Sequence, residues 1–228
     1  MRKNCKVLYY GSENIVDNKN ERRIYISNHP TSFDLFVLMH LSESIINAFI
    51  NEDAYSIPLL GLLLNGAGFL KYARGKGRET MEQAITYIEE KKPFFHSLRS
   101  GVARTRASTK PRTGGIRIAY EAKANIYPIF AMIEKGKEIS RKIRGLDLKI
   151  HPYINFNQTI YFVKFCKALR YKEYAKNPLK HKDFQRLANK IQEIFKQEQQ
   201  GIMKMINENK DYFSRLERIG GSEKRIVF

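Results

Sequence analysis

The sequence has few cysteines and no apolar run long enough to cross a bilayer. Its two cysteines, Cys5 and Cys166, exclude a disulfide framework and a cysteine-based metal cluster, so we expect a reducing compartment and no bound metal. The longest apolar stretch covers only 57–70, which is shorter than the ~20 residues that a transmembrane helix needs. Residues 1–12 contain no apolar core of a signal peptide. We therefore expect a chain that does not span a membrane, although the stretch at 57–70 is able to lie against one.

Acidic residues are in deficit, since Lys and Arg number 41 against 23 Asp and Glu, a net charge of +18. Such an excess implies a polyanionic partner, either nucleic acid, anionic lipid head groups or phosphorylated small molecules. The sequence contains no Cys/His finger, RNA-recognition signature or heptad-linked basic region, which disfavours nucleic acid. Each lysine or arginine near an anionic leaflet contributes about 1 kcal/mol. We therefore expect an anionic membrane surface as the partner.

Strand-like and helix-like segments alternate through the first 133 residues. The predicted strands cover 7–10, 23–27, 69–72, a segment that begins at Phe94, and 125–132, with a further strand at 146–156. The predicted helices cover a segment from the turn at 28–34 to about 50, then 78–91 and 116–122. This order predicts an α/β fold with a mixed sheet flanked by helices at 1–156. An amphipathic helix follows, with an apolar stripe from Phe184 to Phe195 that we interpret as core packing, so 157–228 is predicted to be a basic helical region packed on the same domain.

A histidine and an aspartate lie five residues apart directly after a predicted strand, in Asn28-His29-Pro30-Thr31-Ser32-Phe33-Asp34. Pro30 and the following Thr/Ser pair place a turn and a helix cap between them, so Asp34 enters the first helical turn while His29 precedes it. A carboxylate that holds one imidazole nitrogen fixes the tautomer and leaves the other nitrogen able to act as a base. By themselves, two such residues are also typical of helix capping.

Further motifs follow in a fixed order, at 68–74 (Gly-Phe-Leu-Lys-Tyr-Ala-Arg), at 113–119 (Thr-Gly-Gly-Ile-Arg-Ile-Ala) and at 126–129 (Ile-Tyr-Pro-Ile). With the His-x4-Asp motif and the apolar segment at 56–61, they resemble the conserved blocks of the PlsC-like glycerolipid acyltransferases. The resemblance covers about 9–132. It implies a glycerol-3-phosphate acyltransferase-like fold, with the acyltransferase domain at 1–156.

The resemblance implies transfer of a fatty-acyl chain from acyl-CoA or acyl carrier protein, as co-substrate rather than cofactor, to a lysophospholipid hydroxyl. The acceptor is then expected to be 1-acylglycerol-3-phosphate, at the cytoplasmic face of a membrane that the protein meets as a peripheral or monotopic component of phospholipid biosynthesis. In this family pattern His29 is the general base and Asp34 its orienting partner. The expected substrate-binding residues are Arg74, which would pair with the acceptor phosphate, and Arg99, Gly68 and Thr113.

The third block of the family, Phe-Pro-Glu-Gly-Thr-Arg-Ser, is poorly matched in this chain. The corresponding stretch, 94–100, reads Phe-Phe-His-Ser-Leu-Arg-Ser and lacks the proline, glutamate and glycine. A solvated loop is the expected environment of His96. A catalytically impaired lipid-binding relative is therefore an alternative to an active enzyme, and a basic nucleic-acid-binding protein is a third.

Compensating frameshifts are one hypothesis for this departure. Between His96 and Tyr120 the chain has six basic residues and no acidic one. One set of codons that encodes His-Ser-Leu-Arg, CAT-TCC-CTG-AGG, contains Phe-Pro-Glu in another frame, so the segment from about His96 to Arg112 is hypothesised to be the product of two shifts. Resequencing the gene tests the hypothesis, and an uninterrupted reading frame that encodes the present residues would end it.

Overall fold

Parallel pairing of short, buried strands sets the architecture of this protein. The computed structural model describes residues 5–14, 20–30, 35, 38–39, 46–56, 58–72, 75–98, 111–134, 138–139, 153–154 and 159–209. The strand β2 (Arg23–Ser27) pairs in parallel with β5 (Phe94–Ser97) on one side and with β6 (Asn125–Glu134) on the other. All residues of β2 are buried, as a β-branched and aromatic strand covered on both faces should be.

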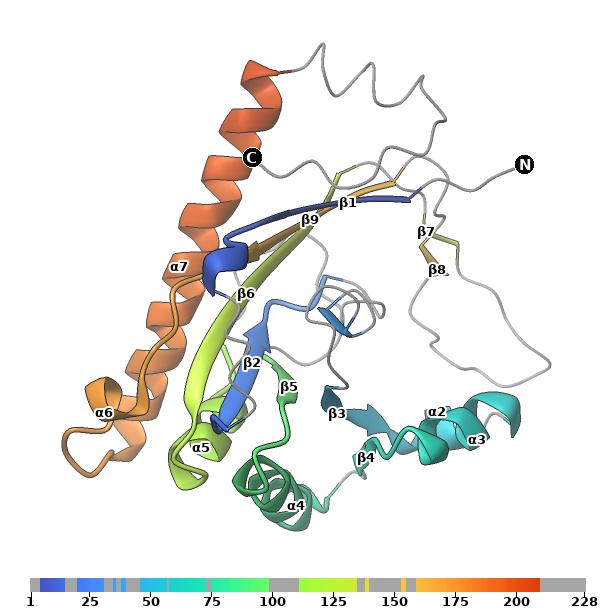
Figure 1. The fold of residues 1–228 in the computed structure, drawn as a ribbon, viewed down its shortest axis with the longest axis vertical. Helices are drawn as coiled ribbons and strands as arrows, with labels where there is room; N and C mark the ends of the chain where they lie inside the picture. The colour runs from blue at the N-terminus through green and yellow to red at the C-terminus, as the bar shows by residue number, and fades with distance from the viewer. Residues whose placement is uncertain are drawn as a thin grey trace.

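The full sheet has seven strands in the order β1-β9-β6-β2-β5-β3-β4 (Figure 1). On one side, β9 (Thr159–Phe165) runs antiparallel to β6 and parallel to the edge strand β1 (Cys5–Tyr10). On the other side, β3 (Asn47–Asn51) runs parallel to β5 and to the edge strand β4 (Leu70–Tyr72). A separate antiparallel pair is formed by β7 (Glu138–Ile139) and β8 (Tyr153–Ile154). The sheet is therefore mixed, which confirms the predicted fold class.

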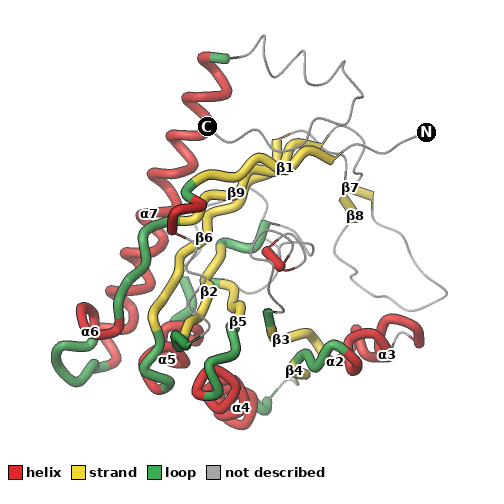
Figure 2. The backbone as a smooth tube through the Cα atoms, in the orientation of Figure 1, coloured by secondary structure: helices red, strands yellow, loops and turns green. Residues whose placement is uncertain are grey.

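Helices lie around this sheet (Figure 2). Their bounds in the described residues are η1 Ser12–Asn14, α2 Glu52–Tyr55, α3 Pro58–Gly66, α4 Gly77–Glu89, α5 Gly114–Glu121, α6 Tyr171–Tyr174 and α7 His181–Glu208. The long helix α7 follows one side of the molecule, whereas α2 and α3 lie beyond β3 and β4 on the opposite side (Figure 1). None of the helices in the described part of the chain is both long and apolar enough to cross a membrane.

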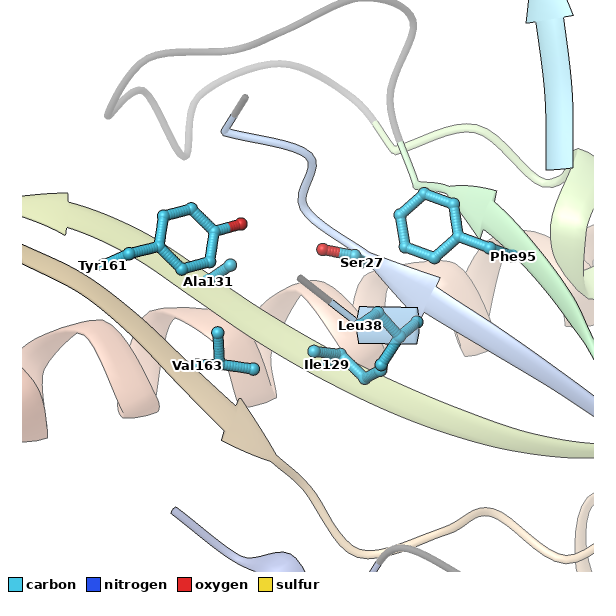
Figure 3. Close-up of a pocket in the computed structure, with 7 residues that line it drawn as sticks. All are labelled: Ser27, Leu38, Phe95, Ile129, Ala131, Tyr161 and Val163. Atoms are coloured by element: carbon cyan, nitrogen blue, oxygen red, sulfur yellow. The ribbon is translucent and has the colours of Figure 1, made fainter. Parts of the chain in front are cut away.

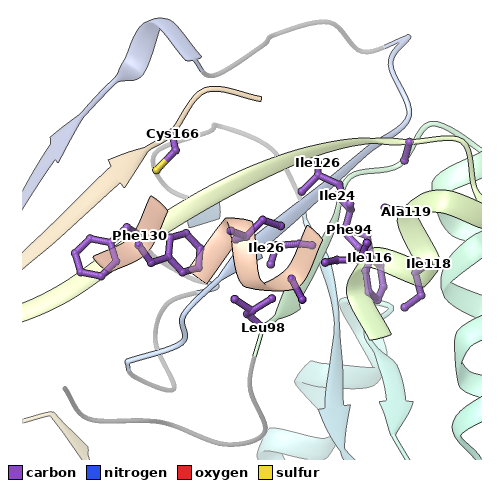
Figure 4. Close-up of a cluster of buried hydrophobic side chains, with 14 of the residues drawn as sticks. Ile24, Ile26, Phe94, Leu98, Ile116, Ile118, Ala119, Ile126, Phe130 and Cys166 are labelled. Atoms are coloured by element: carbon purple, nitrogen blue, oxygen red, sulfur yellow. The ribbon is translucent and has the colours of Figure 1, made fainter. Parts of the chain in front are cut away.

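Alternation along the strands builds a core on each face of the sheet. Ile24 and Ile26 of β2 point toward α4, α5 and α7 and belong to a cluster that also contains Ile116 of α5 (Figure 4). Tyr25, between them, joins the cluster on the other face, with Leu38 from the segment that follows β2. Because side chains alternate with a period of two, one strand can stabilise both layers at once.

The helix α7 packs its apolar stripe against the sheet and against α5. The ring of Phe195 lies 6.0 Å from that of Phe130 on β6, and the ring of Phe184 lies 5.5 Å from that of Tyr120 on α5. Ile202 is also buried, so the contact continues past Gly201. The interpretation of this stripe as core packing is confirmed.

Two predictions of secondary structure were wrong. The helix expected to run to about residue 50 ends earlier, because Asn47–Asn51 form β3. The strand β9 was not predicted at all. It follows residue 156, yet it belongs to the same sheet as the strands that precede that residue. The division into 1–156 and 157–228 stays a prediction. Of the strand expected at 146–156, only 153–154 are described, and they are extended.

Candidate functional site

The side chain of Asn28 continues the sheet where the backbone of β2 leaves it. Its amide nitrogen donates to the carbonyl of Ala131 at 2.8 Å, and its amide oxygen accepts from the N–H of Ala131 at 2.8 Å. The last paired residues of β2 and β6 are Ser27 and Ile129. The carboxamide of Asn28 therefore takes the place of the next backbone pair in this parallel ladder. Asn28 therefore fixes the start of the loop to β6 by two hydrogen bonds.

His29 follows in a left-handed backbone conformation, with φ of 55°. A positive φ is unusual outside glycine and turns the chain sharply away from the strand. The His29 N–H donates to the buried hydroxyl of Ser27 at 3.3 Å, and the imidazole lies edge-on to Phe95 with ring centroids 6.4 Å apart. The ring is only half-buried. The histidine is thus positioned by the ends of β2 and β5 and retains access to solvent.

A small recess lies beside this turn, on the face of the sheet that carries Tyr25. Most of its lining is apolar, and its lining residues are Ser27, Leu38, Phe95, Ile129, Ala131, Tyr161 and Val163 (Figure 3). The hydroxyls of Ser27 and Tyr161 point toward one another across it (Figure 3). His29 is not one of the lining residues, but its backbone N–H contacts Ser27 and its imidazole lies beside Phe95, which both line the recess.

A second histidine lies at the end of β5. The solvated loop expected for His96 is wrong, because His96 belongs to β5 and is half-buried. Its Nδ1 lies 2.6 Å from the carbonyl of Ser97, and its ring packs against the start of α5, where a Cβ on Gly115 would come within 3.0 Å of the ring. Gly115 is therefore needed for this close approach.

Desolvation lowers the pKa of His96, the hydrogen bond to Ser97 raises it, and the charge of Arg112, with that of His29 when its imidazole is protonated, lowers it, so that the pKa is about 4. The N-terminus of a helix also disfavours a nearby cation. At neutral pH, His96 is consequently an uncharged ring. It differs in this respect from the glutamate that the family pattern has in the third block.

The predicted site residues are only partly described by the structure. Asp34, Arg74 and Arg99 lie outside the described residues. Gly68 lies in the turn after α3 and has φ of 71°, and its carbonyl accepts a hydrogen bond from the buried amide of Asn47 at 2.7 Å. Thr113 directly precedes α5 and accepts the Arg117 N–H on its carbonyl at 2.9 Å. Roles for Gly68 and Thr113 in substrate binding stay predictions.

No group of three or more His, Cys, Asp or Glu in the described ranges is arranged to hold a metal ion. The contributions of Asn28 and Asn47 were not anticipated from the sequence. A signal for Asn28 was present, since an asparagine directly after a buried strand can replace a backbone rung.

A family model described as Acyltransferase matches residues 6–132, more than half of the chain. The chain belongs to the acyltransferase family. This confirms the family resemblance drawn from the ordered motifs. The matched region ends within β6, the strand that Asn28 contacts.

The fold of this acyltransferase is similar to that of a solved enzyme, the 1-acyl-sn-glycerophosphate (LPA) acyltransferase PlsC from Thermotoga maritima. The two chains share 13% sequence identity with a TM-score of 0.59, over 86% of this chain and 73% of the other. At this identity the likeness concerns the fold alone. A comparison with curated proteins gave no significant match.

Removal of the Asn28 carboxamide should destabilise the fold. Asn28→Ala leaves the buried N–H and carbonyl of Ala131 without these partners, so we expect the free energy of unfolding to fall by about 1–3 kcal/mol. Urea titration measures this change. Asn65→Ala, at an exposed position of α3, is the control and should change the value by less than about 0.5 kcal/mol. Equal stabilities of the two variants would contradict this account of Asn28.

The pKa of His96 also predicts how stability depends on pH. Below about pH 6.5 the unfolded chain takes up a proton on this imidazole, whereas the folded chain does not until about pH 4. The contribution is thus fully present above pH 6.5 and is lost as the pH falls toward 4, by about 3 kcal/mol in total. Urea titrations of wild type and His96→Asn across this range should differ in slope, and the exposed His181→Asn should follow wild type. Parallel slopes for wild type and His96→Asn would refute the assignment.

Proposed function

We propose that the protein transfers a fatty-acyl chain from an acyl-CoA or acyl-ACP thioester to the hydroxyl of a lysophospholipid, 1-acylglycerol-3-phosphate. The observation that carries the proposal is the position of His29 at the end of β2, beside an apolar recess. The hydrogen bonds of Asn28 to Ala131 and of the His29 N–H to Ser27 hold it there. Membership of the acyltransferase family supports the same chemistry. The protein is proposed to bind peripherally to the cytoplasmic face of a membrane. Its reaction would belong to phospholipid biosynthesis.

The proposed reaction is a direct attack without a covalent acyl-enzyme. The neutral imidazole of His29 takes the proton of the acceptor hydroxyl, while the oxygen forms a bond to the thioester carbonyl carbon. Collapse of the tetrahedral intermediate breaks the C–S bond, and the imidazolium returns its proton to the departing thiolate. In the family pattern Asp34 orients the imidazole, and Arg74 binds the acceptor phosphate, where its planar guanidinium suits a bidentate contact.

A second candidate function is lipid binding without turnover. The neutral, desolvated ring of His96 occupies the third block, where the family pattern has a carboxylate. Thiol release from acyl-CoA and acyl-ACP, measured with and without lysophosphatidic acid, separates the two candidates. Release that depends on the acceptor supports the enzyme, and binding of the acceptor without release supports the alternative.

The role of His29 is tested by its replacement with alanine. His29→Ala should lower kcat by about 10²–10⁴-fold, because general-base catalysis contributes that much, while binding of lysophosphatidic acid persists. Thiol release under saturating substrates gives kcat, and equilibrium dialysis gives the binding.

Two controls accompany this variant. His181→Ala removes an exposed histidine on α7 and should leave kcat unchanged. Arg74→Ala should instead raise the acceptor KM, because it loses a charge-assisted contact. Wild-type turnover by purified His29→Ala would exclude His29 as the base.

A further inference from the structure

The helix α3 presents its apolar side to solvent. Leu59, Leu62 and Leu63 are exposed to 71%, 70% and 61%, although they belong to one short helix. At about 100° per residue these three positions share one face of the helix, and the buried positions, Gly61 and Leu64, lie on the other. An isolated exposed leucine is ordinary, but a whole helix face of leucine marks a contact surface.

The orientation of α3 is fixed by close contacts on its buried side. A Cβ on Gly61 would lie 2.2 Å from the carbonyl oxygen of Tyr55, so only glycine lets α3 approach α2 this closely. The Tyr55 hydroxyl donates to the carbonyl of Phe69 at 2.7 Å, and the buried Asn47 amide donates to that of Gly68 at 2.7 Å. The segment directly after α3 is thus held by two hydrogen bonds, and the first turns of α3 are held by the close approach of Gly61 to Tyr55, so α3 cannot roll its leucines inward without breaking these contacts.

Charged residues follow α3 along the chain. The segment 54–78 contains Lys71, Arg74, Lys76 and Arg78 and no acidic residue. The ammonium of Lys71 lies 4.7 Å from the Tyr55 ring centroid, directly beside α2. Glu52 and Asp53 of α2 and Glu79 and Glu82 of α4 equal these cations in number. Lys76 lies 3.8 Å from Glu79 and Arg78 lies 3.0 Å from Glu82, so the attraction to an anionic surface comes from the net charge of +18 of the whole chain.

An exposed apolar face on a chain with a net charge of +18 fits an anionic lipid surface. A second copy of this chain is a poorer occupant, because each copy carries a net charge of +18 and the copies repel one another. With nine residues, α3 is far too short to span a bilayer, but a helix of this kind can lie in the interface with its apolar side among the acyl chains.

We propose that Leu59, Leu62 and Leu63 of α3 insert into the head-group boundary of an anionic bilayer and form the membrane-contact surface of the protein. The inference deepens the proposed function, because a lysophospholipid acceptor resides in such a bilayer. The strands β2 and β3 are both parallel to β5, so their carboxyl ends lie at the same edge of the sheet. His29 follows β2 at this edge and α2, which leads into α3, follows β3, so α3 and His29 lie toward the same edge.

The test compares the full-length protein with a variant that carries Leu59→Gln, Leu62→Gln and Leu63→Gln. Flotation with vesicles of phosphatidylcholine and phosphatidic acid measures the partition coefficient. We expect the triple variant to lose about tenfold in partitioning per leucine that inserts. Met203→Gln removes an exposed apolar side chain of α7 and is the matched control, which should float like wild type. Thermal unfolding should be unchanged in both variants, since all four side chains are exposed.

Equal flotation of wild type and the triple variant would overturn the proposal. The proposal would also be overturned if the wild-type protein did not float and was a dimer, while the triple variant was a monomer. A second copy of the chain would then be what covers the leucines. Turnover on a short-chain lysophosphatidic acid dispersed as monomers separates this surface from the chemistry. The triple variant should retain that turnover while losing vesicle binding, whereas His29→Ala should bind vesicles and lack turnover.

Discussion

The position of His29 depends on one pair of hydrogen bonds, between the carboxamide of Asn28 and the backbone of Ala131. The strand β2 must stop pairing where the chain turns into the His-x4-Asp motif, and at that point a buried rung of β6 would lose its partners. The Asn28 side chain supplies both a donor and an acceptor, so the turn can begin without that cost. The left-handed backbone of His29 is then stabilised by its N–H donation to Ser27. Asn28, the first residue of the motif, is therefore the residue that joins His29 to the sheet.

Local patterns predicted most elements of the fold, and those that failed have a physical reason. Period-two and period-3.6 apolar patterns identified β2, β5, β6, α4, α5 and α7, because each is amphipathic or buried within its own segment. The predicted helix was extended through Ser42-Glu43-Ser44 into β3, because apolar residues continue on both sides of this short polar break. The strand β9 pairs with β1, at Cys5 with Thr159, and such a distant partner cannot be read from either segment alone.

The sequence predicted the family but not the geometry of the candidate site. The order of the motifs was sufficient to predict the family and to select His29, because residue types and their spacing are local properties. The hydrogen bonds of Asn28 to Ala131 and the packing of His96 on Gly115 join segments that are distant along the chain, so only the structure reveals them. The exposed face of α3 is a similar case, since the apolar stretch was evident but the direction of its leucines was not.

The central claim is that His29 lies in the site that binds the lipid acceptor. Modification of the wild-type protein by diethyl pyrocarbonate, followed by mass spectrometry, measures the accessibility of each imidazole with and without lysophosphatidic acid. Our account predicts that the lipid protects His29 in a saturable manner, whereas the exposed His181 on α7 reacts equally in both samples. Modification of His29 at the same rate in saturating lysophosphatidic acid, with the lipid shown to be bound, would contradict it.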